Sequence, residues 1–350
     1  FGLSSAPLWT DRFLRCIDFA LKRAGLSHVR YCDDFLFVAP TAEALRAALG
    51  VAQHVLQKHG LVVNHDKTEG PSQSITFLGL GIDSVNQVTF VPDDKVGELL
   101  QLAGDMHNRT HTKLRHLQSL IGKFSFAAAV LPGARPFFRR LIDATRGQHK
   151  FASIPLSSDM REDLQAWTSF LKKGNRKQRW VGSDPFVLEH DASKSGFGFL
   201  LTAVPQGFDV AQLPPHLRPG QSFAGYYSPR HFSDVERSIQ WGEMLAMAVS
   251  MAMYAPYMRN SSVLLKTDNL ADVHIIRRQS TSSQPLLKLL RCIFAACAHY
   301  NIDITVEHVP GQLNTVPDYL SRPSLHQNRA RFDRDQYTYH THFIHSSSFR

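Results

Sequence analysis

The spacing of apolar residues near the start of the chain predicts two amphipathic helices. In the first, from Asp11 to Gly25, the spaced apolar residues are Phe13, Leu14, Ile17, Ala20 and Leu21. The second helix spans residues 41–60, "TAEALRAALGVAQHVLQKHG", where Thr41 can cap the start and Gly60 can end it.

Short apolar runs on both sides of the second helix predict strands. The stretch "VRYCDDFLFVA" (residues 29–39) indicates two strands joined by a tight turn at its Asp pair. Further strands are expected in "LVVNHDKT" (61–68) and in "SITFLGLGIDS" (74–84). The order strand–strand–helix–strand–strand predicts an α+β domain, which we assign to residues 1–91.

Residues 92–184 are expected to be mainly helical, with a break at "LPGARP" (131–136). The basic residues of this segment include Lys113, Arg115, Lys123, Arg135, Arg139 and Arg140. Such a basic surface could follow the phosphates of a nucleic acid, although charged runs are more often only solvated.

A second α/β domain is expected over residues 185–323. Strands are expected at 185–192, 196–204, 221–228, 262–268 and 303–309, with long helices at 233–257 and 284–301. The pattern predicts a mixed five-stranded sheet with helices. Residues 324–350 are polar, rich in His and Arg, and expected to be poorly ordered.

Composition favours a globular protein that binds polyanions. The 350 residues carry a formal charge of +9 and 18 His. The four Cys are scattered, which is typical of reduced intracellular thiols, and no apolar run is long enough to span a membrane. The chain begins at Phe1, so we expect a fragment of a larger polyprotein, located in the cytoplasm or nucleus.

Asp33 and Asp34 are the first candidate site. Two carboxylates at the tip of a hairpin can hold Mg²⁺, which prefers carboxylate and phosphate oxygens. The alternative is ordinary turn chemistry, which favours Asp in the same place.

The context of the Asp pair resembles reverse transcriptases. The stretch "RYCDDFLFVA" resembles their Tyr-x-Asp-Asp signature, and "FGLSSAP" (1–7) resembles the motif that precedes it. The stretch "HGLVVNHDKTEGPSQSITFLGLGID" (59–83) resembles the next two motifs. The resemblance implies that Asp33 and Asp34 are metal ligands. Lys67 is then either a proton donor to pyrophosphate or an ordinary solvated Lys.

The resemblance also implies a further catalytic Asp on a palm strand before the "FGLSSAP" motif. That motif begins at residue 1 here. We therefore expect an incomplete polymerase palm, and we expect that these 350 residues do not extend a primer by themselves.

Four acidic residues of the second α/β domain form the second candidate site. They are Asp191, Glu243, Asp268 and Asp318. Strand ends and inward helix faces can bring such residues together, and clustered carboxylates need a metal ion to neutralise them. Taken singly, Asp268 could be a helix cap and Glu243 a solvated helix residue.

This acidic set resembles the ribonuclease H domain that follows reverse transcriptase in retroelements of DIRS-type or gypsy-like kind. The matching motifs are "HDASKSGFGFLL" (190–201), "GEMLAMA" (242–248), "LLKTDN" (264–269) and "VPGQLNTVPDYLSR" (309–322). Two departures are Pro317, where Ala is usual, and the absence of a His from the "GQLN" loop.

The resemblance implies cleavage of RNA in RNA–DNA hybrids, dependent on Mg²⁺ with Mn²⁺ as a substitute. Its partners would be hybrid and primer–template nucleic acid, with no membrane. One alternative is a catalytically inactive or domesticated nucleic-acid-binding protein derived from a retroelement. A pararetroviral polymerase, which shares the motifs, is another.

Overall fold

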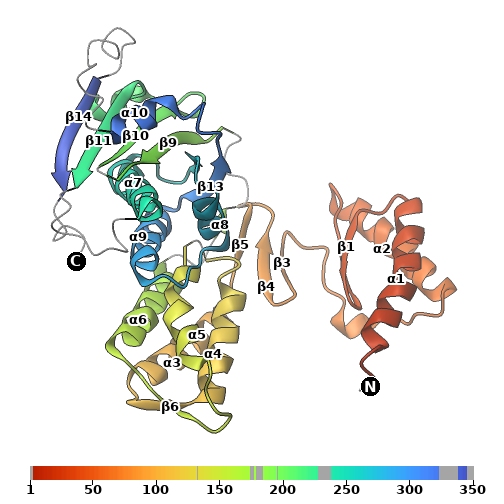
Figure 1. The fold of residues 1–350 in the computed structure, drawn as a ribbon. Coiled ribbons are helices and arrows are strands. Elements are labelled where there is room, and N and C mark those ends of the chain that lie inside the picture. Colours follow the sequence, from red (N-terminus) through yellow and green to blue (C-terminus); the bar gives the residue numbers. More distant parts are fainter. Residues whose placement is uncertain are drawn as a thin grey trace. The chain divides into compact units, whose positions relative to one another are not determined.

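The structure is a computed structural model that describes residues 3–131, 133–173, 177–178, 184–194, 196–227, 238–322 and 338–344. The chain forms two compact units, Phe1–Val88 and Thr89–Arg350 (Figure 1). The division at Val88 lies close to the expected end of the first domain at residue 91. The segments 92–184 and 185–323, which we expected to be separate domains, fall within one unit.

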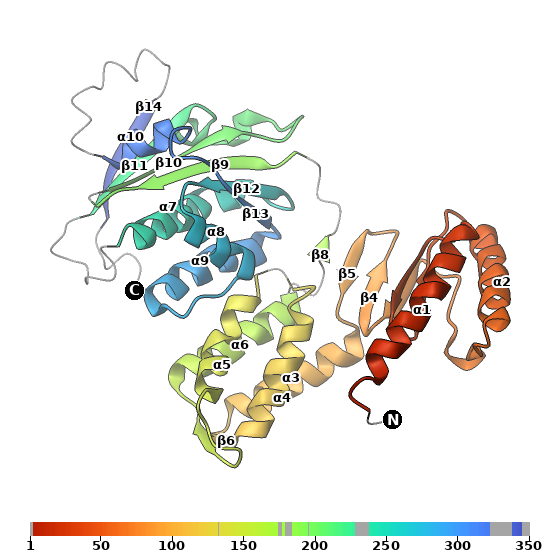
Figure 2. The same cartoon turned by 45° about the vertical axis from the view of Figure 1, so that its right-hand side comes forward.

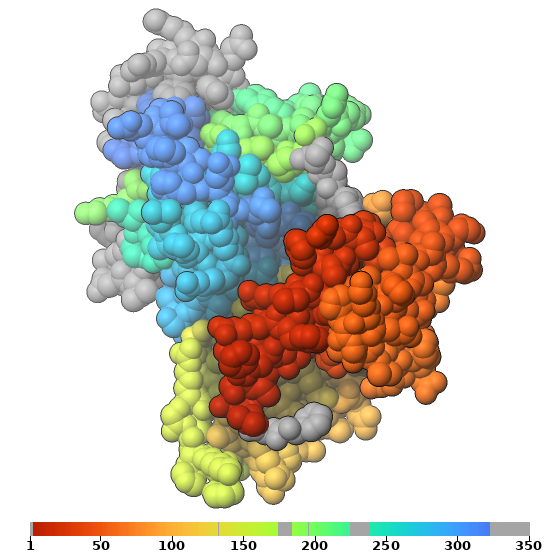
Figure 3. Space-filling view, turned by 90° about the vertical axis from the view of Figure 1, so that its right-hand side faces the viewer, coloured from red at the N-terminus to blue at the C-terminus, as the bar shows by residue number. Residues whose placement is uncertain are grey.

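The N-terminal unit combines two helices with two short hairpins. Its elements are α1 (Ala6–Arg23), β1 (His28–Tyr31), β2 (Asp34–Phe37), α2 (Ala42–Lys58), η1 (His65–Lys67), β3 (Ser74–Phe77) and β4 (Leu80–Asp83). Helix α1, red in Figure 3, lies on the surface of this unit and buries Leu14, Ile17 and Leu21 in its core. The predicted cap of α2 is present, because the Thr41 hydroxyl accepts a hydrogen bond from the Ala44 amide at 3.1 Å.

The strand expected over residues 61–68 is not present, so that prediction was wrong. A single 3₁₀ turn, η1, lies there instead. The side-chain carbonyl of Asn64 accepts a hydrogen bond from the amide of Asp66 at 3.0 Å, and such a local bond competes with an extended backbone. Lys67 therefore ends a turn rather than lying on a strand.

Helices dominate the first part of the C-terminal unit. The elements are β5 (Val88–Phe90), α3 (Asp93–His107), β6 (His111–Lys113), α4 (Leu114–Ala127), η2 (Arg135–Phe138), α5 (Arg139–Thr145), β7 (Ser153–Pro155), α6 (Ser158–Lys173) and β8 (Lys177–Gln178). Phe124 and Trp167 stack at the centre, with ring centroids 4.1 Å apart, and join α4 to α6. The mainly helical character matches the sequence prediction.

A mixed sheet with helices on both faces forms the rest of this unit (Figures 1 and 2). The strands, in spatial order, are β13 (Asp303–His308), β12 (Ser262–Thr267), β9 (Phe186–Ala192), β10 (Gly196–Ala203), β11 (Gln221–Tyr227) and β14 (Thr338–Ile344). The α-helices described in this part are α7 (Ile239–Tyr254), α8 (Leu270–Arg278), α9 (Gln284–Tyr300) and α10 (Thr315–Ser321). Helices α7, α8 and α9 cover one face and α10 packs on the other. The predicted five-stranded mixed sheet is confirmed, and β14 extends it.

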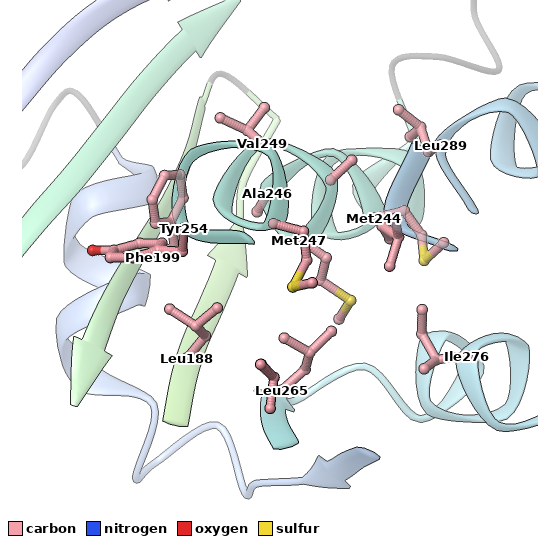
Figure 4. Packing of buried hydrophobic residues seen from close by; sticks show 14 of the residues in the cluster. Leu188, Phe199, Met244, Ala246, Met247, Val249, Tyr254, Leu265, Ile276 and Leu289 are labelled. Carbon is pink, nitrogen blue, oxygen red and sulfur yellow. The ribbon is translucent and has the colours of Figure 1, made fainter. Parts of the chain in front are cut away.

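Helix α7 lies against the sheet and is buried along most of its length. Figure 4 shows its Met247 side chain close to Leu265 of β12, with Leu188 of β9 nearby. The helix is shorter than the expected span 233–257. It begins after Ser238, whose hydroxyl accepts a hydrogen bond from the Trp241 amide at 3.1 Å, and residues 233–237 lie outside the described part of the chain.

The C-terminal segment 324–350 contributes one strand to the described part of the chain. Residues 338–344 form β14, which pairs in parallel with β11. The remaining residues of that segment lie outside the described part of the chain. Among the described helices, none combines the length and the apolar character that crossing a membrane requires.

Candidate metal centre

Three of the predicted acidic residues meet at one end of the sheet. Strands β9 and β12 run in parallel with Lys266 opposite Glu189, so Asp268 follows β12 beside Asp191 of β9. Glu243 reaches the same point from the first turns of α7. One carboxylate oxygen from each residue lies within 4.8 Å of the other two. We call Asp191, Glu243 and Asp268 the acidic cluster.

Two hydrogen bonds hold Glu243 in the cluster. Its Oε1 accepts from the backbone amide of Ala192 at 3.0 Å, and its Oε2 accepts from the Thr267 hydroxyl at 3.3 Å. Glu243 is thereby tied to the ends of both β9 and β12. The solvated helix position considered for it is excluded, since its exposed fraction is 1%.

Burial disfavours negative charge throughout the cluster. Burial, aided by the charges of Asp268 and Asp318, raises the pKa of Asp191 to about 7. Burial and the charges of Asp191 and Asp268 raise the pKa of Glu243 to about 9. The pKa of Asp268 is also raised, mainly by burial. The ionised cluster therefore requires positive charge close by.

The donor set fits a hard divalent cation. All three donors are carboxylates, the ligands that Mg²⁺ and Mn²⁺ prefer over nitrogen or sulfur. The buried position and the raised pKa values indicate that a bound cation would relieve the repulsion among the three side chains.

Asp318 lies near the cluster without being part of it. It is on α10, and its carboxylate pairs with Arg322 one turn later. It is not among the three residues whose oxygens lie within 4.8 Å. Its charge nevertheless raises the pKa values of Asp191 and Asp268. The structure thus brings three of the four predicted carboxylates together and holds the fourth beside them.

The Asp pair of the N-terminal unit lies at the turn of the β1–β2 hairpin, as expected. Tyr31 and Asp34 pair across the hairpin, and Cys32 turns the chain with a φ of 51°. Asp33, Asp34 and Lys67 line one cavity of about 850 Å³. Neither Asp belongs to a group of three metal-ligating residues within the described part of the chain.

Two residues that sequence analysis did not single out also lie at the cluster. Asp272, in the first turn of α8, is fully buried, which raises its pKa to about 7, and its charge raises the pKa of Glu243. Asn314, at the start of α10, donates from Nδ2 to Oδ1 of Asp191 at 3.5 Å. Asn314 is within the quoted "GQLNTVPDYLSR" motif, four residues before Asp318, so its position was a usable signal.

The basic residues of the helical segment divide into two groups. Lys123 pairs with Glu98, Arg139 with Asp143, and Arg140 with acidic residues of α6. Lys113, Arg115 and Arg135 are exposed. Among these six residues, the described ion pairs leave Lys113, Arg115 and Arg135 available to phosphates.

Comparison with known protein families gives a match for the first part of the chain. Residues 1–82 match the family model "Reverse transcriptase (RNA-dependent DNA polymerase)". Residues 1–82 are therefore similar to reverse transcriptases, and the resemblance of the Asp33–Asp34 motifs to that family is confirmed.

The relatives are viral polyproteins. The chain is 25% identical to the enzymatic polyprotein of Figwort mosaic virus (strain DxS) over 341 residues, covering 92% of this chain and 44% of the polyprotein. It is 21% identical to the putative enzymatic polyprotein of Cassava vein mosaic virus, covering 87% of this chain and 44% of the polyprotein. The chain thus spans less than half of the curated relatives that it matches most fully.

A solved structure with a similar trace is "Structure of the foamy viral protease-reverse transcriptase in complex with RNA/DNA hybrid". The TM-score is 0.44 at 16% identity, and the match covers 87% of this chain and 38% of the foamy viral chain.

Proposed function

We propose that the chain is part of a retroelement reverse transcriptase with ribonuclease H activity. Residues 185–323 would hydrolyse the RNA strand of RNA–DNA hybrids. The observation that carries the proposal is the acidic cluster, in which carboxylate oxygens of the buried Asp191 and Glu243 and of the half-buried Asp268 lie within 4.8 Å of one another. Residues 1–91 would be palm and residues 92–184 thumb and connection.

In the proposed site, Asp191, Glu243 and Asp268 hold divalent cations, with Mg²⁺ as the expected ion. Bound Mg²⁺ would activate water and stabilise the leaving oxygen, so that the phosphodiester breaks to a 3′-hydroxyl and a 5′-phosphate. The Ala192 amide and the Thr267 hydroxyl orient Glu243. Asp318 adds negative charge at the edge of the site and is held by Arg322.

The N-terminal unit has a separate proposed role in the RNA-directed DNA polymerase of the whole protein. Its match to the reverse transcriptase family supports this role. Asp33 and Asp34 are the proposed metal ligands and Lys67 the proposed proton donor to pyrophosphate. Their shared cavity supports a common site for the three side chains.

The nuclease proposal is tested with Asp191→Asn, assayed on a labelled RNA–DNA hybrid with Mg²⁺. The expected result is loss of RNA cleavage with hybrid binding retained, because the change removes one ligand charge and keeps the side chain's shape. Asp209→Asn is the matched control: Asp209 is exposed in the same unit and caps a 3₁₀ turn, which Asn can also do.

Normal cleavage by Asp191→Asn would contradict the proposal. Hybrid binding without any cleavage by the unsubstituted chain, in Mg²⁺ or Mn²⁺, would favour the inactive nucleic-acid-binding alternative instead.

A further inference from the structure

Asn314 makes an unusual set of contacts for the residue that precedes a helix. Its side chain is 1% exposed. Its Nδ2 donates to the backbone carbonyl of His190 at 2.8 Å and points to Oδ1 of Asp191 at 3.5 Å. Both neighbours are acceptors, so the amide must present its nitrogen to them. The contacts themselves therefore fix the orientation of the amide group.

Asn314 does not use its side chain to cap its own helix. An Asn at this position usually accepts a hydrogen bond from the second or third helical amide, but α10 has no such bond. Within the described part of the chain, its buried Oδ1 also has no hydrogen-bond partner. The side chain is thus directed away from α10 and toward the end of β9, where Asp191 lies.

The loop that ends at Asn314 passes against a second carboxylate of the cluster. A Cβ added to Gly311 would lie 3.1 Å from Oδ2 of Asp268, so the loop backbone approaches that side chain closely. The loop is tied to β12 by the Val309 amide, which donates to the Thr267 carbonyl at 2.9 Å. Asn314 therefore completes a connection from β12, along the loop, to β9.

Strand pairing determines which face of the sheet the Asp191 side chain lies on. Asp191 lies opposite Gly198 on β10, on the face of the sheet that α10 covers. The neighbouring His190 points to the other face, where its Nε2 lies 2.7 Å from the Ser250 hydroxyl of α7. The α7 side thus fixes the backbone of β9, and the Asn314 amide contacts the Asp191 carboxylate itself.

We propose that Asn314 is a positioning residue that orients the Asp191 carboxylate for a divalent cation. The inference rests on the proposed function of the acidic cluster and deepens it. Asn314 contacts one oxygen of Asp191 and, through the His190 carbonyl, the strand that carries it. Partners of this kind restrict the rotation of a ligand and change metal affinity by roughly 10–100-fold.

The test is isothermal titration of the cation-free 350-residue chain with Mg²⁺, comparing Asn314→Ala and Asn314→Ser with the unsubstituted protein. Both variants lose the donor to Asp191, so we expect at least about tenfold weaker Mg²⁺ binding for both. Ser can cap α10, so Asn314→Ser should lose less thermal stability than Asn314→Ala while binding Mg²⁺ no better. A purely structural role for Asn314 predicts instead that Mg²⁺ affinity follows stability, so that Asn314→Ser binds Mg²⁺ more tightly than Asn314→Ala.

A core variant and a double variant complete the experiment. Ile293→Val trims a buried residue of α9, and its Mg²⁺ affinity should be unchanged despite some loss of stability. In an Asp191→Asn background, adding Asn314→Ala should weaken Mg²⁺ binding by less than twofold, because the proposed effect passes through Asp191.

Unchanged Mg²⁺ affinity in both single Asn314 variants would overturn the inference. An equal loss of Mg²⁺ affinity on adding Asn314→Ala to the unsubstituted chain and to Asp191→Asn would overturn it as well. These outcomes are separate from the nuclease proposal, because the readout is Mg²⁺ binding. A chain that binds Mg²⁺ but cleaves no hybrid would refute the proposed activity and leave the role of Asn314 standing.

Discussion

At the scale of single residues, the carboxyl groups of the acidic cluster hold protons that a bound cation must displace. Burial raises the pKa values of Asp191 and Glu243 to about 7 and about 9, from ordinary values of 3.8 and 4.5. Between about pH 4 and pH 9, the folded chain therefore binds more protons than the unfolded chain. Without a cation its stability should fall as the pH rises through this range.

Mg²⁺ binding should consequently strengthen with pH. Only ionised carboxylates bind the cation well, so binding expels protons below about pH 9, where Glu243 remains partly protonated. We expect the apparent affinity of the 350-residue chain to rise from about pH 6 and to level off above about pH 9. Titration calorimetry in buffers of different ionisation enthalpy measures both the affinity and the protons released. A flat affinity over this range, with no proton release, would show that the cluster is already ionised.

The sequence allowed part of the acidic cluster to be predicted. The pattern of strands and turns indicated that Asp191, Glu243, Asp268 and Asp318 could meet, and the structure brings the first three together. It could not predict Asp272, whose role depends on burial beside Glu243, and although the motif before Asp318 contains Asn314, it could not predict the contact of Asn314 with Asp191. Such contacts depend on how α8 and α10 pack and leave no periodic signal along the chain.

At the scale of elements, local chemistry decided where prediction succeeded and failed. Helix α2 was predictable because its apolar spacing and its Thr41 cap agree. The strand predicted over residues 61–68 is absent because the hydrogen-bonded turn at Asn64 outweighs the apolar start of the segment. The β6–β7 ribbon joins residues 111–113 to 153–155, and each strand is three residues long. Pairing between such short and distant segments has no detectable sequence pattern.

Helix α10 depends on a glycine in the strand beneath it. A Cβ on Gly198 would lie 2.4 Å from Cβ of Leu320 and 3.0 Å from the Pro317 carbonyl, so no larger residue fits without moving α10. We expect Gly198→Ala to destabilise the C-terminal unit by about 1–3 kcal/mol. It should also weaken Mg²⁺ binding, because Asn314 directly precedes α10 and would move with it. Urea unfolding and calorimetry measure the two effects.

The control for this change is Gly122→Ala, in the interior of α4. A Cβ there meets no atom within 4 Å, so Ala should be neutral or stabilise the helix by up to about 1 kcal/mol. If Gly198→Ala behaved like Gly122→Ala, the close packing of α10 on β10 would not be a constraint on the site.

At the scale of the whole molecule, an ion-pair network joins the helical segment to the sheet-containing domain. The fully buried Asp163 of α6 pairs with Arg291 of α9 and lies 3.6 Å from Arg140 of α5. Arg291 also stacks over Phe137, 4.6 Å from the ring centroid. The domain boundary expected at 184/185 is therefore bridged by buried charge, which sequence composition could not reveal.

Removing Arg291 should loosen this junction in a pH-dependent way. Burial already raises the pKa of Asp163 to about 6, and Arg291 opposes that shift, so Arg291→Met should raise it further. A raised pKa means that stability is lost as the pH increases from the unfolded value of 3.8 to the folded value. We expect a loss of about 3 kcal/mol near pH 8 and a smaller loss near pH 5, where the carboxyl holds its proton. Urea unfolding at the two pH values measures the difference.

Lys123→Met is the comparison for the Arg291 change. Lys123 pairs with Glu98 in the same unit, but both side chains are exposed, so the loss should stay below about 1 kcal/mol at either pH. A loss in Arg291→Met that was equally small and independent of pH would mean that apolar packing, and not the buried ion pairs, holds α9 to α6. In that case, replacing both Asp163 and Arg291 with apolar residues of similar volume should stabilise the unit, because the desolvation of both charges would no longer oppose folding.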